Sequence, residues 1–395
     1  MVTIARTYGQ THPWLTFRLD LSRARPDFWM LLGEARSKCQ HVEYSLLTPE
    51  VAADLHELFL AKGALATTAI EGNTLSEEDV VKAIEGKLKL PPSQDYLRQE
   101  IDNIVAAFRD IASDLLRPGG SAELSRARIE EFNGMVLKDL DLEPDVIPGE
   151  VRKNSVGVAR YRGAPAEDCE YLLDRLCEWL NSPELQPSEA TMNVPYAIIK
   201  AVIAHLYLAW IHPFGDGNGR TARLVEHQIL LAAGVPTPAT HLLSNHYNLT
   251  RARYYQELDR SSRAGEQGDV LAFLHYAVEG MVDGLQYQLR LIWKQQFQDR
   301  WEQFVYQAFG HTNSETDVRR RRLVLDLSKR DEAVPQGELR RVSPAVAEAY
   351  AGKTSKTVTR DVNALLELDL IERVAEGLRP RSRMILAFLP EVRID

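Results

Sequence analysis

The sequence predicts a mainly α-helical protein with a small second module at its C-terminal end. Apolar residues recur at helical spacing in long stretches, over 51–70, 96–116 and 196–211. Glycine or proline ends these stretches, as at Gly72 and Pro213. Alternating apolar residues, the pattern of a strand, are confined to short segments, so helices are expected to make up most of the fold.

Composition and charge limit the class of protein. Hydrophobic residues make up 45% of the 395 and charged residues 26%, which excludes a disordered or collagen-like chain. At roughly 150 residues per domain, this length predicts two or three domains. The net charge of −9 argues against a protein that only coats nucleic acid. It is uneven, however: residues 316–395 carry +3 and the rest −12, a first indication of a separate module.

Cysteine usage and hydropathy predict a cytoplasmic protein. The three cysteines, Cys39, Cys169 and Cys177, lack metal-ligand spacing, and their odd number argues against a disulfide scaffold. No apolar run follows a basic patch at the N-terminus, so no secretory signal is expected. The most apolar stretch, 196–211, is predicted to be too short to cross a membrane, and no membrane partner is expected.

Three helices are predicted in the N-terminal third. The first ends at Gly72, and Thr74 with Glu77 three residues later predicts a capping box at the start of the second. The third, 96–116, ends before a Pro/Gly cluster that is the first candidate domain boundary. The predicted organisation is an N-terminal helical region (1–115), a core (116–290), a helical connector (291–315) and a C-terminal module (316–395).

A short hairpin and further helices are predicted in the core. Val156, Val158 and Tyr161 alternate around glycines, which predicts a hairpin. Helices are expected over 172–180, 196–211 and 220–233, and again over 250–260 and 269–310. Pro195 suits the first turn of the second of these helices, and Gly234 suits the end of the third.

The densest group of reactive side chains lies between the helices predicted at 196–211 and 220–233. Three glycines, Gly215, Gly217 and Gly219, allow backbone N–H groups to turn toward one point. The start of the second helix adds a positive dipole, so the loop suits a phosphate. It is not a P-loop, because no Lys-Ser/Thr pair follows the glycines and a helix precedes them.

Each polar side chain of this loop has a candidate role. Asn218 can donate from its amide, and Arg220 offers a planar set of donors for phosphate oxygens. Asp216 is a hard oxygen ligand suited to Mg²⁺, and His212 can exchange a proton near neutral pH. Taken singly, such residues are more commonly a helix cap and an ordinary turn. Together they predict a phosphoryl- or nucleotidyl-transfer site.

Residues 212–223, HPFGDGNGRTAR, resemble the signature of the Fic family, His-Pro-Phe-x-Asp/Glu-Gly-Asn-Gly-Arg-x-x-Arg, at every defining position. The resemblance implies a helical Fic core that transfers AMP from ATP to a hydroxyl of a target protein or of the enzyme itself. It implies that His212 deprotonates this hydroxyl and that Asp216 holds Mg²⁺ on the α- and β-phosphates. Phe214 would pack into the core. The phosphate-binding groups would be Asn218, Arg220 and the backbone of Gly217 and Gly219. A homodimer, common in the family, is also expected.

A second family motif precedes the signature. Residues 67–72, TTAIEG, resemble the inhibitory motif Ser/Thr-x-x-x-Glu-Gly/Asn. The resemblance implies an inhibitory helix over about 50–72, whose Glu71 pairs with Arg223 and takes the place of the ATP γ-phosphate. By itself the segment is only a helix end, where a glutamate without a partner is electrostatically unfavourable.

Two further assignments follow only from the resemblance. The hairpin at Val156, Gly157 and Val158 lies where Fic proteins carry a flap that docks the target by strand addition; an ordinary surface hairpin is the alternative. Asn248, Tyr254 and Tyr255 resemble the helix that faces the adenine, although paired aromatic residues on a helix more commonly belong to a core.

The last 80 residues predict a winged helix-turn-helix. A helix with an apolar face at Val358, Val362 and Leu365 is followed by two predicted strands, 370–374 and 383–388, around a basic loop. Candidate contacts to DNA phosphates are Lys353, Lys356, Arg360, Arg379 and Arg381.

Three other functions stay open from the sequence alone. Asp361, Glu367 and Asp369 lie on or next to the same C-terminal helix, so this module could serve protein contacts instead of DNA. The chain could be a DNA-binding regulator whose Fic domain is secondary. Finally, the Fic site could remove AMP from a target or use another nucleotide.

Overall fold

The computed structural model describes residues 6–117, 122–155, 157–158, 161–263, 270–310 and 314–386. It divides into two compact units, Met1–Arg290 and Leu291–Asp395. The boundary falls inside a long helix, α12 (Val270–Ala308). Each unit has its own hydrophobic core.

The first unit is mainly helical, as the spacing of apolar residues predicts. Its helices are α1 (Tyr8–Thr11), α2 (Pro26–Glu43), α3 (Pro49–Ala69), α4 (Glu77–Ile84), α5 (Asp95–Leu116), α6 (Arg126–Val136), α7 (Ala166–Leu180), α8 (Asn193–Ile211), α9 (Asn218–Ala232), α10 (Leu242–Leu249), α11 (Arg251–Arg263) and the first part of α12. A 3-10 helix, η5 (Thr237–His241), connects α9 to α10. The predicted hairpin is present: β1 (Gly157–Val158) pairs antiparallel with β2 (Tyr161–Arg162), whereas Val156 lies outside the described residues.

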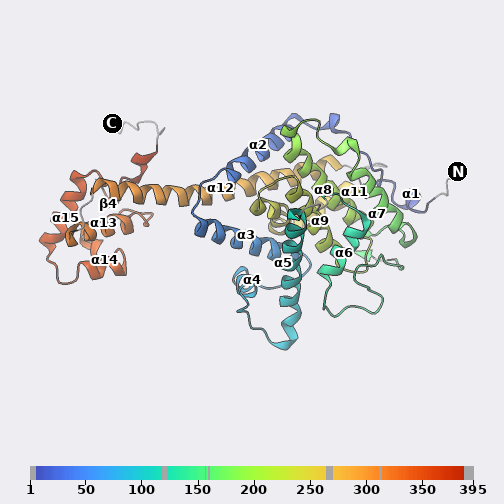
Figure 1. Cartoon of the computed structure of the whole chain (residues 1–395), viewed down its shortest axis with the longest axis horizontal. Coiled ribbons are helices and arrows are strands. Elements are labelled where there is room, and N and C mark those ends of the chain that lie inside the picture. Colours follow the sequence, from blue (N-terminus) through green and yellow to red (C-terminus); the bar gives the residue numbers. More distant parts are fainter. Residues whose placement is uncertain are drawn as a thin grey trace. The chain divides into compact units, whose positions relative to one another are not determined.

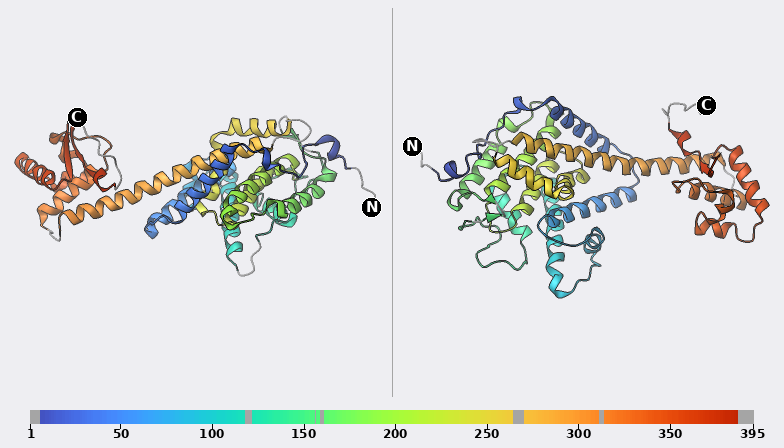
Figure 2. Two further views of the ribbon diagram at one scale, coloured as in Figure 1. Left: turned by 90° about the horizontal axis from the view of Figure 1, so that it is seen from above. Right: turned by 180° about the vertical axis from the view of Figure 1, so that it is seen from behind.

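Helices α8 and α9 form the centre of the first unit. Helices α2 and α7 pack against α8, whereas α3, α5 and α6 pack against α9 (Figure 1). Figure 2 shows the chain from above and from behind, with the colours of Figure 1. Because the two central helices are covered, the loop between them is held from several directions, and this loop carries the predicted chemistry.

Helix α8 is longer than predicted. Within the described part of the chain, residues 190–211 are long and apolar enough to cross a membrane, and 78% of the most apolar window is buried in the structure. The prediction therefore underestimated the length of this apolar stretch, while its burial is that of a helix in a protein core. The reason is that α8 begins at Asn193 and continues a 3-10 turn, Ala190–Met192.

The capping box of α4 lies two residues later than predicted. Ser76 Oγ accepts a hydrogen bond from the Asp79 backbone, and the Asp79 carboxylate accepts one from the Ser76 backbone, each at 3.2 Å. Asn73 causes the shift, because its side chain accepts from the backbone N–H of Leu75 at 3.1 Å and forms a turn there. The helix can begin only after that turn.

The second unit contains α13 (Glu315–Leu327), α14 (Pro344–Ala349), α15 (Ser355–Glu367) and a hairpin of β3 (Ile371–Val374) and β4 (Gly377–Pro380). The end of α12, predicted as a connector, supplies Trp301 and Val305 to its core.

The predicted second strand at 383–388 was wrong. The strand is β4, inside the segment predicted as a basic loop, while Ser382–Ile385 forms a 3-10 turn and residues 387–388 lie outside the described residues. Leu378 explains the difference. It is 1% exposed, and its backbone exchanges two hydrogen bonds with Val334, of 2.8 and 2.9 Å. A single buried leucine, between Gly377 and Arg379, therefore sets the strand.

Candidate active site

The loop between α8 and α9 contains two residues with left-handed backbone conformation. His212 ends α8 with φ of 49°, and Gly217 precedes α9 with φ of 76°. Glycine adopts this conformation freely, whereas a residue with a side chain pays about 1–2 kcal/mol. The conformation of His212 must therefore be stabilised by its surroundings.

Arg152 provides this stabilisation. Its buried guanidinium donates to the carbonyl of His212 at 2.8 Å, of Asn154 at 2.7 Å and of Ala164 at 2.5 Å. Its own backbone N–H donates to the Pro213 carbonyl at 2.9 Å. Arg152 was not predicted from the sequence, since a lone arginine beside a hairpin gives no local signal.

The imidazole of His212 is suited to act as a base. Burial, followed by the nearby charge of Arg152, lowers the pKa of His212 to about 4. The ring is therefore neutral at pH 7 and can accept a proton.

Asn218 mainly supports the loop. Its Oδ1 accepts from the Phe214 N–H and its Nδ2 donates to the Phe214 carbonyl, both at 2.9 Å. The Phe214 ring is 1% exposed and lies in the core, as predicted. Only the second N–H of the Asn218 amide remains for a phosphate, so its predicted role as a donor is reduced.

Asn133 on α6 supports the other half of the loop. Its Nδ2 donates to the Asp216 carbonyl at 2.9 Å, and its Oδ1 accepts from the Gly149 N–H at 3.0 Å. A Cβ at position 217 would lie 3.0 Å from this Nδ2, so the close approach as well as the positive φ requires Gly217. Asn133 also escaped the sequence analysis.

Arg220 lies between two carboxylates. Its Nη1 donates to Glu100 Oε1 at 2.9 Å and its Nη2 to Asp216 Oδ1 at 3.2 Å. The arginine side chain is 5% exposed, whereas that of Asp216 is 50% exposed. Glu100, from α5, was not predicted. A phosphate at Arg220 would therefore compete with these two carboxylates.

Glu71 follows α3, and its carboxylate lies over the first turn of α9. Arg223 Nη2 donates to Glu71 Oε1 at 2.5 Å and to the Thr67 carbonyl at 2.8 Å. A Cβ on Gly219 would clash with the same carboxylate oxygen. Burial acts to raise the pKa of Glu71, but the charge and hydrogen bond of Arg223 lower this pKa overall. The expected ion pair is thus present.

Helix α11 holds the end of α3. The Ile70 carbonyl accepts from the Tyr255 hydroxyl at 3.3 Å and also from the Arg251 guanidinium. A cation at the C-terminal end of a helix is electrostatically favourable. Arg251, which the sequence did not indicate, therefore fixes the residue that immediately precedes Glu71.

A cavity of about 510 Å³ lies beside the loop. Its polar side includes Glu71, His212, Asn218 and Gly219. The rest of the lining is largely apolar or aromatic and includes Ile70, Ala209, Trp210, Ala222, Tyr254, Tyr255 and Leu258. Of the three residues expected to face the adenine, Tyr254 and Tyr255 line this cavity, whereas Asn248 is not among the lining residues. Polar groups at one side of an apolar cavity suit a nucleotide.

The hairpin leads directly to His212. The Ala164 N–H, just after β2, donates to the Ile211 carbonyl at 3.1 Å. A Cβ at Gly163 would lie 3.0 Å from the Cβ of His212. The strand that leaves the hairpin therefore passes next to the candidate base.

The second unit has a different distribution of charge. On α15, Lys356 and Arg360 are exposed and make no hydrogen bond or ion pair with the described residues. Asp361 is 1% exposed and accepts hydrogen bonds of 2.8 Å from both Arg319 and Arg320, so it adds no negative charge to the surface.

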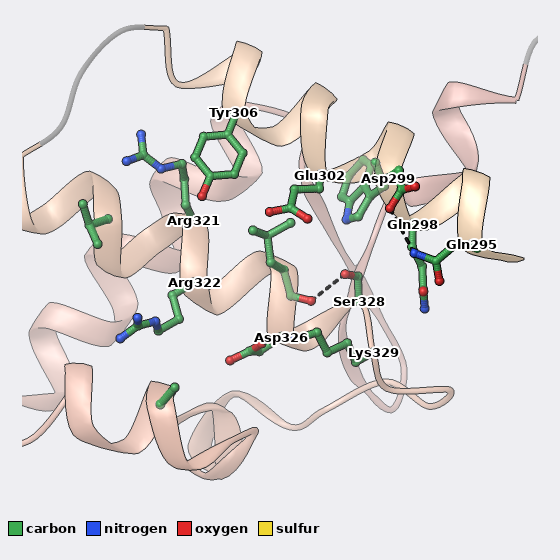
Figure 3. Close-up of a pocket in the computed structure, with 14 residues that line it drawn as sticks. Gln295, Gln298, Asp299, Glu302, Tyr306, Arg321, Arg322, Asp326, Ser328 and Lys329 are labelled. Carbon is green, nitrogen blue, oxygen red and sulfur yellow. Dashed lines mark hydrogen bonds and ion pairs between the residues drawn. The ribbon is translucent and has the colours of Figure 1, made fainter. Parts of the chain in front are cut away.

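The basic residues of the hairpin in the second unit are paired. Arg379 donates to Glu372 at 2.6 Å and Arg381 to Asp369 at 2.5 Å. A cleft of about 630 Å³ between the end of α12 and α13 is lined by both signs of charge (Figure 3). These residues are Asp299, Glu302, Asp326, Arg321, Arg322 and Lys329. The cleft has no glycine-rich turn, so it does not resemble the cavity of the first unit.

Known structures share this fold. A crystal structure of a Fic family protein from Desulfovibrio desulfuricans G20 matches with a TM-score of 0.53 and 20% identity, over 90% of this chain and 96% of that one. Fic-1 from Caenorhabditis elegans matches with a TM-score of 0.54 and 25% identity, over 68% and 73% of the two chains.

Proteins of similar sequence also include Fic proteins. Protein adenylyltransferase fic-1 of C. elegans is 29% identical over 246 residues, and that of C. briggsae is 30% identical over 249. These matches cover 62% of this chain but only 44% of each relative, so the chain spans less than half the length of the relatives it matches. The Fic/DOC family model matches residues 123–230, which include α8 and its glycine-rich loop. The chain therefore carries a Fic/DOC family domain.

Proposed function

We propose that this protein transfers AMP from ATP to a hydroxyl of a target protein, or of itself. The observation that carries the proposal is the single cavity lined by His212, Asn218, Gly219 and Glu71. It brings a neutral base, the N-terminal end of a helix and an apolar wall together in a space that suits a nucleotide.

His212 acts as general base in this proposal. It takes the proton of the attacking hydroxyl, whose oxygen forms a bond to the α-phosphorus. The bond from the α-phosphorus to the oxygen bridging the α- and β-phosphates breaks, and pyrophosphate leaves. Gly217, Gly219 and Arg220 bind the phosphates through backbone N–H groups and the guanidinium.

Asp216 is the proposed ligand for Mg²⁺. Its side chain is half exposed, and its Oδ1 is used by Arg220, which leaves the second oxygen for a metal. The described residues contain no group of three or more His, Cys, Asp or Glu that could hold a metal. Mg²⁺ suits such a site, since it commonly takes one carboxylate and completes its shell with phosphates and water. When bound, it would neutralise charge on the α- and β-phosphates.

Glu71 is proposed to inhibit transfer. Its carboxylate occupies the first turn of α9 and pairs with Arg223, both of which a γ-phosphate would need. Like charge makes the carboxylate and a phosphate mutually exclusive at this position.

The hairpin is proposed to dock the target. Its backbone passes next to His212, so a segment added to this edge would present a hydroxyl near the base. Val156, which was also predicted to belong to this flap, lies outside the described residues.

Mass spectrometry tests the proposed activity. The full chain with Glu71→Gly is incubated with Mg²⁺ and each nucleoside triphosphate in turn, and the added mass on the protein is measured. We expect an AMP adduct from ATP. Transfer of another nucleotide would show that the donor substrate is a different nucleoside triphosphate. If no adduct forms and a pre-formed AMP adduct is hydrolysed instead, the AMP-removing alternative is favoured.

A second candidate function is DNA binding by the second unit. Helix α15 followed by the β3–β4 hairpin, with Val334 paired to Leu378 of β4, supports a winged helix-turn-helix. Lys356 and Arg360, which are exposed and pair with none of the described residues, and Lys353 just before the helix support phosphate contacts. Electrophoretic mobility shift of a DNA duplex with the full chain at low salt tests this candidate.

Two expectations from the sequence stay predictions. Light scattering during size-exclusion chromatography would measure the expected homodimer. Cell fractionation would locate the protein, for which the cytoplasm is expected; the three free cysteines are buried.

A further inference from the structure

Glu226, His205 and Tyr254 form a chain of polar contacts next to the nucleotide cavity. His205 Nδ1 lies 3.2 Å from Glu226 Oε2, and His205 Nε2 lies 2.8 Å from the Tyr254 hydroxyl. The side chains of His205 and Glu226 are 0% and 1% exposed. His205 and Tyr254 both line the cavity of about 510 Å³. None of the roles proposed above uses Glu226 or His205.

Glu226 determines which nitrogen of His205 carries the proton. Its Oε1 accepts a hydrogen bond from the Tyr247 hydroxyl at 2.9 Å, so Oε2 remains for His205. Although their contact is not ideally aligned, neither His205 Nδ1 nor Glu226 Oε2 has another hydrogen-bond partner among the described residues. An unprotonated Nδ1 would place a lone pair against the carboxylate, which is repulsive. In neutral His205 the proton therefore lies on Nδ1.

This tautomer fixes the hydrogen bond at Tyr254. With the proton on Nδ1, His205 Nε2 is an acceptor, and Tyr254 must donate its only hydroxyl proton to it. Burial raises the pKa of Tyr254, so the hydroxyl keeps that proton. The Tyr254 oxygen is then left with lone pairs alone, and toward a ligand it can only accept.

We propose that Glu226 and His205 are positioning residues that make the Tyr254 hydroxyl a hydrogen-bond acceptor and thereby select the nucleoside. The inference rests on the proposed nucleotide site. The selected group is an N–H or O–H donor, from either the 6-amino group of adenine or a ribose hydroxyl. A base with a carbonyl at position 6 would place oxygen against oxygen there.

The position of Glu226 fits this role. It lies seven residues after Gly219 on α9, which is about 10 Å along the helix from the phosphate-binding end. The contacts among Glu226, His205 and Tyr254 therefore act beyond the phosphates, on the part of the nucleotide that distinguishes one nucleoside from another.

Binding measurements on the full chain test the proposal. With Glu71→Gly to free the γ-phosphate position, isothermal titration calorimetry gives Kd for ATP, purine riboside triphosphate, inosine triphosphate, 2′-deoxy-ATP and 3′-deoxy-ATP. We expect ATP to bind about tenfold tighter than the analogue that lacks the donor, the effect of one good hydrogen bond. Weaker binding of purine riboside triphosphate than of ATP identifies the amino group as the donor. Weaker binding of a deoxy analogue identifies the ribose hydroxyl.

Glu226→Gln should reverse the direction of the hydrogen bonds that connect this residue, His205 and Tyr254. The amide of glutamine can donate to His205 Nδ1, which moves the histidine proton to Nε2 and makes Tyr254 a donor toward the cavity. The preference of about tenfold for ATP over the donor-lacking analogue should disappear. If the amino group is the selected donor, the affinity for inosine triphosphate should increase relative to that for ATP. Tyr247→Phe is the matched control, because it removes the other partner of Glu226 but leaves the tautomer, so the preference should persist.

Tyr254→Phe keeps the test decisive if Glu226→Gln does not fold, as judged by circular dichroism. It should bind ATP and the analogue equally. An unchanged preference in either folded variant overturns the inference while leaving the nucleotide site intact. Failure of the Glu71→Gly chain to bind any triphosphate would instead overturn the proposed function on which the inference rests.

Discussion

The start of α9 and the start of α15 are both helix ends at which phosphates are expected, yet their cations are placed in opposite ways. At α9, the side chains of Arg220 and Arg223 are 5% and 0% exposed, and each is paired with a carboxylate. At α15, Lys356 and Arg360 are exposed and pair with none of the described residues. The first site holds a defined geometry that a ligand must enter, whereas the second offers charge to any nearby polyanion.

This difference has an energetic basis. A buried cation must be paired, because leaving it alone in the interior costs several kcal/mol, of the order of 3–5 when one partner is removed. The partner then becomes a competitor for the ligand, as Glu71 is proposed to be for the γ-phosphate. An exposed cation is solvated and contributes mainly through counterion release, which depends on salt.

The largest expected effect tests whether the buried site does chemistry. In the Glu71→Gly chain, His212→Ala should reduce transfer by about 10²–10⁴, the usual contribution of a general base, while ATP binding is retained. Quantitative mass spectrometry gives the rate and calorimetry the affinity. His41→Ala, which alters an exposed histidine of α2, serves as control. Persistent transfer by the His212 variant would remove His212 as the base.

The pH dependence of the same reaction sharpens this test. Because the pKa of His212 is held at about 4, its ring should be unprotonated throughout the neutral range. Because the charge of Glu71 raises this pKa, its removal cannot bring the pKa of His212 closer to neutral. Transfer in the Glu71→Gly chain should therefore stay level from pH 8 down to about 5 and fall only at or below about pH 4, where the base becomes protonated. A rate that already halves near pH 6.5 would show that the base has an ordinary histidine pKa.

The next effect concerns the carboxylate that competes with phosphate. Glu71→Gly alone should raise transfer at least about tenfold, because it frees Arg223 and the first turn of α9. Glu77→Ala is a suitable control, since it removes another ion pair of α3, with Lys62 at 2.8 Å, away from the cavity. Equal rates for the two variants would exclude inhibition by Glu71.

The sequence predicted the parts of this site that are local. The glycine-rich loop, the helix that follows it and the Glu71 motif each lie within at most 15 adjacent residues, where spacing carries information. Arg152, Asn133 and Glu100 were missed because each contacts the loop across a long separation in sequence, of 60, 83 and 120 residues. Their side chains follow no periodic pattern, so only the fold brings them to the loop.

The C-terminal unit shows the same limit in another form. The charges of the hairpin suggested a basic loop, but Leu378 alone is buried there and makes the segment a strand. Asp361 looked like a surface charge, but Arg319 and Arg320 bury it. Local composition therefore did not predict which charges of this module are buried or paired.

A smaller effect is expected on DNA binding when the exposed cations of α15 are replaced. If the unit binds DNA, Lys356→Ala with Arg360→Ala should weaken binding by roughly tenfold at low salt and reduce the slope of log K against log salt by about 2. Fluorescence anisotropy of a labelled duplex at several salt concentrations measures both. Arg379→Ala is a matched control, because this arginine is already paired with Glu372 and should contribute less. A slope that is the same in all three proteins would exclude α15 as the contact.

The smallest effect tests how rigidly the buried pair is held. Arg251 and Tyr255 donate to the Ile70 carbonyl, one residue before Glu71, and they do so from α11, outside the ion pair itself. Removing the guanidinium with Arg251→Ala should loosen the end of α3 and lower the occupancy of the Glu71–Arg223 contact without abolishing it. We expect transfer by the otherwise unchanged chain to rise about threefold, in line with a loss of somewhat under 1 kcal/mol from a partly exposed contact at a helix end. Combined with Glu71→Gly, the same substitution should add nothing, because the carboxylate that Arg251 positions is already gone. A further rise in the double variant would mean that Arg251 acts on the nucleotide directly. Inhibition of the buried site would then depend less on Glu71 than its geometry indicates.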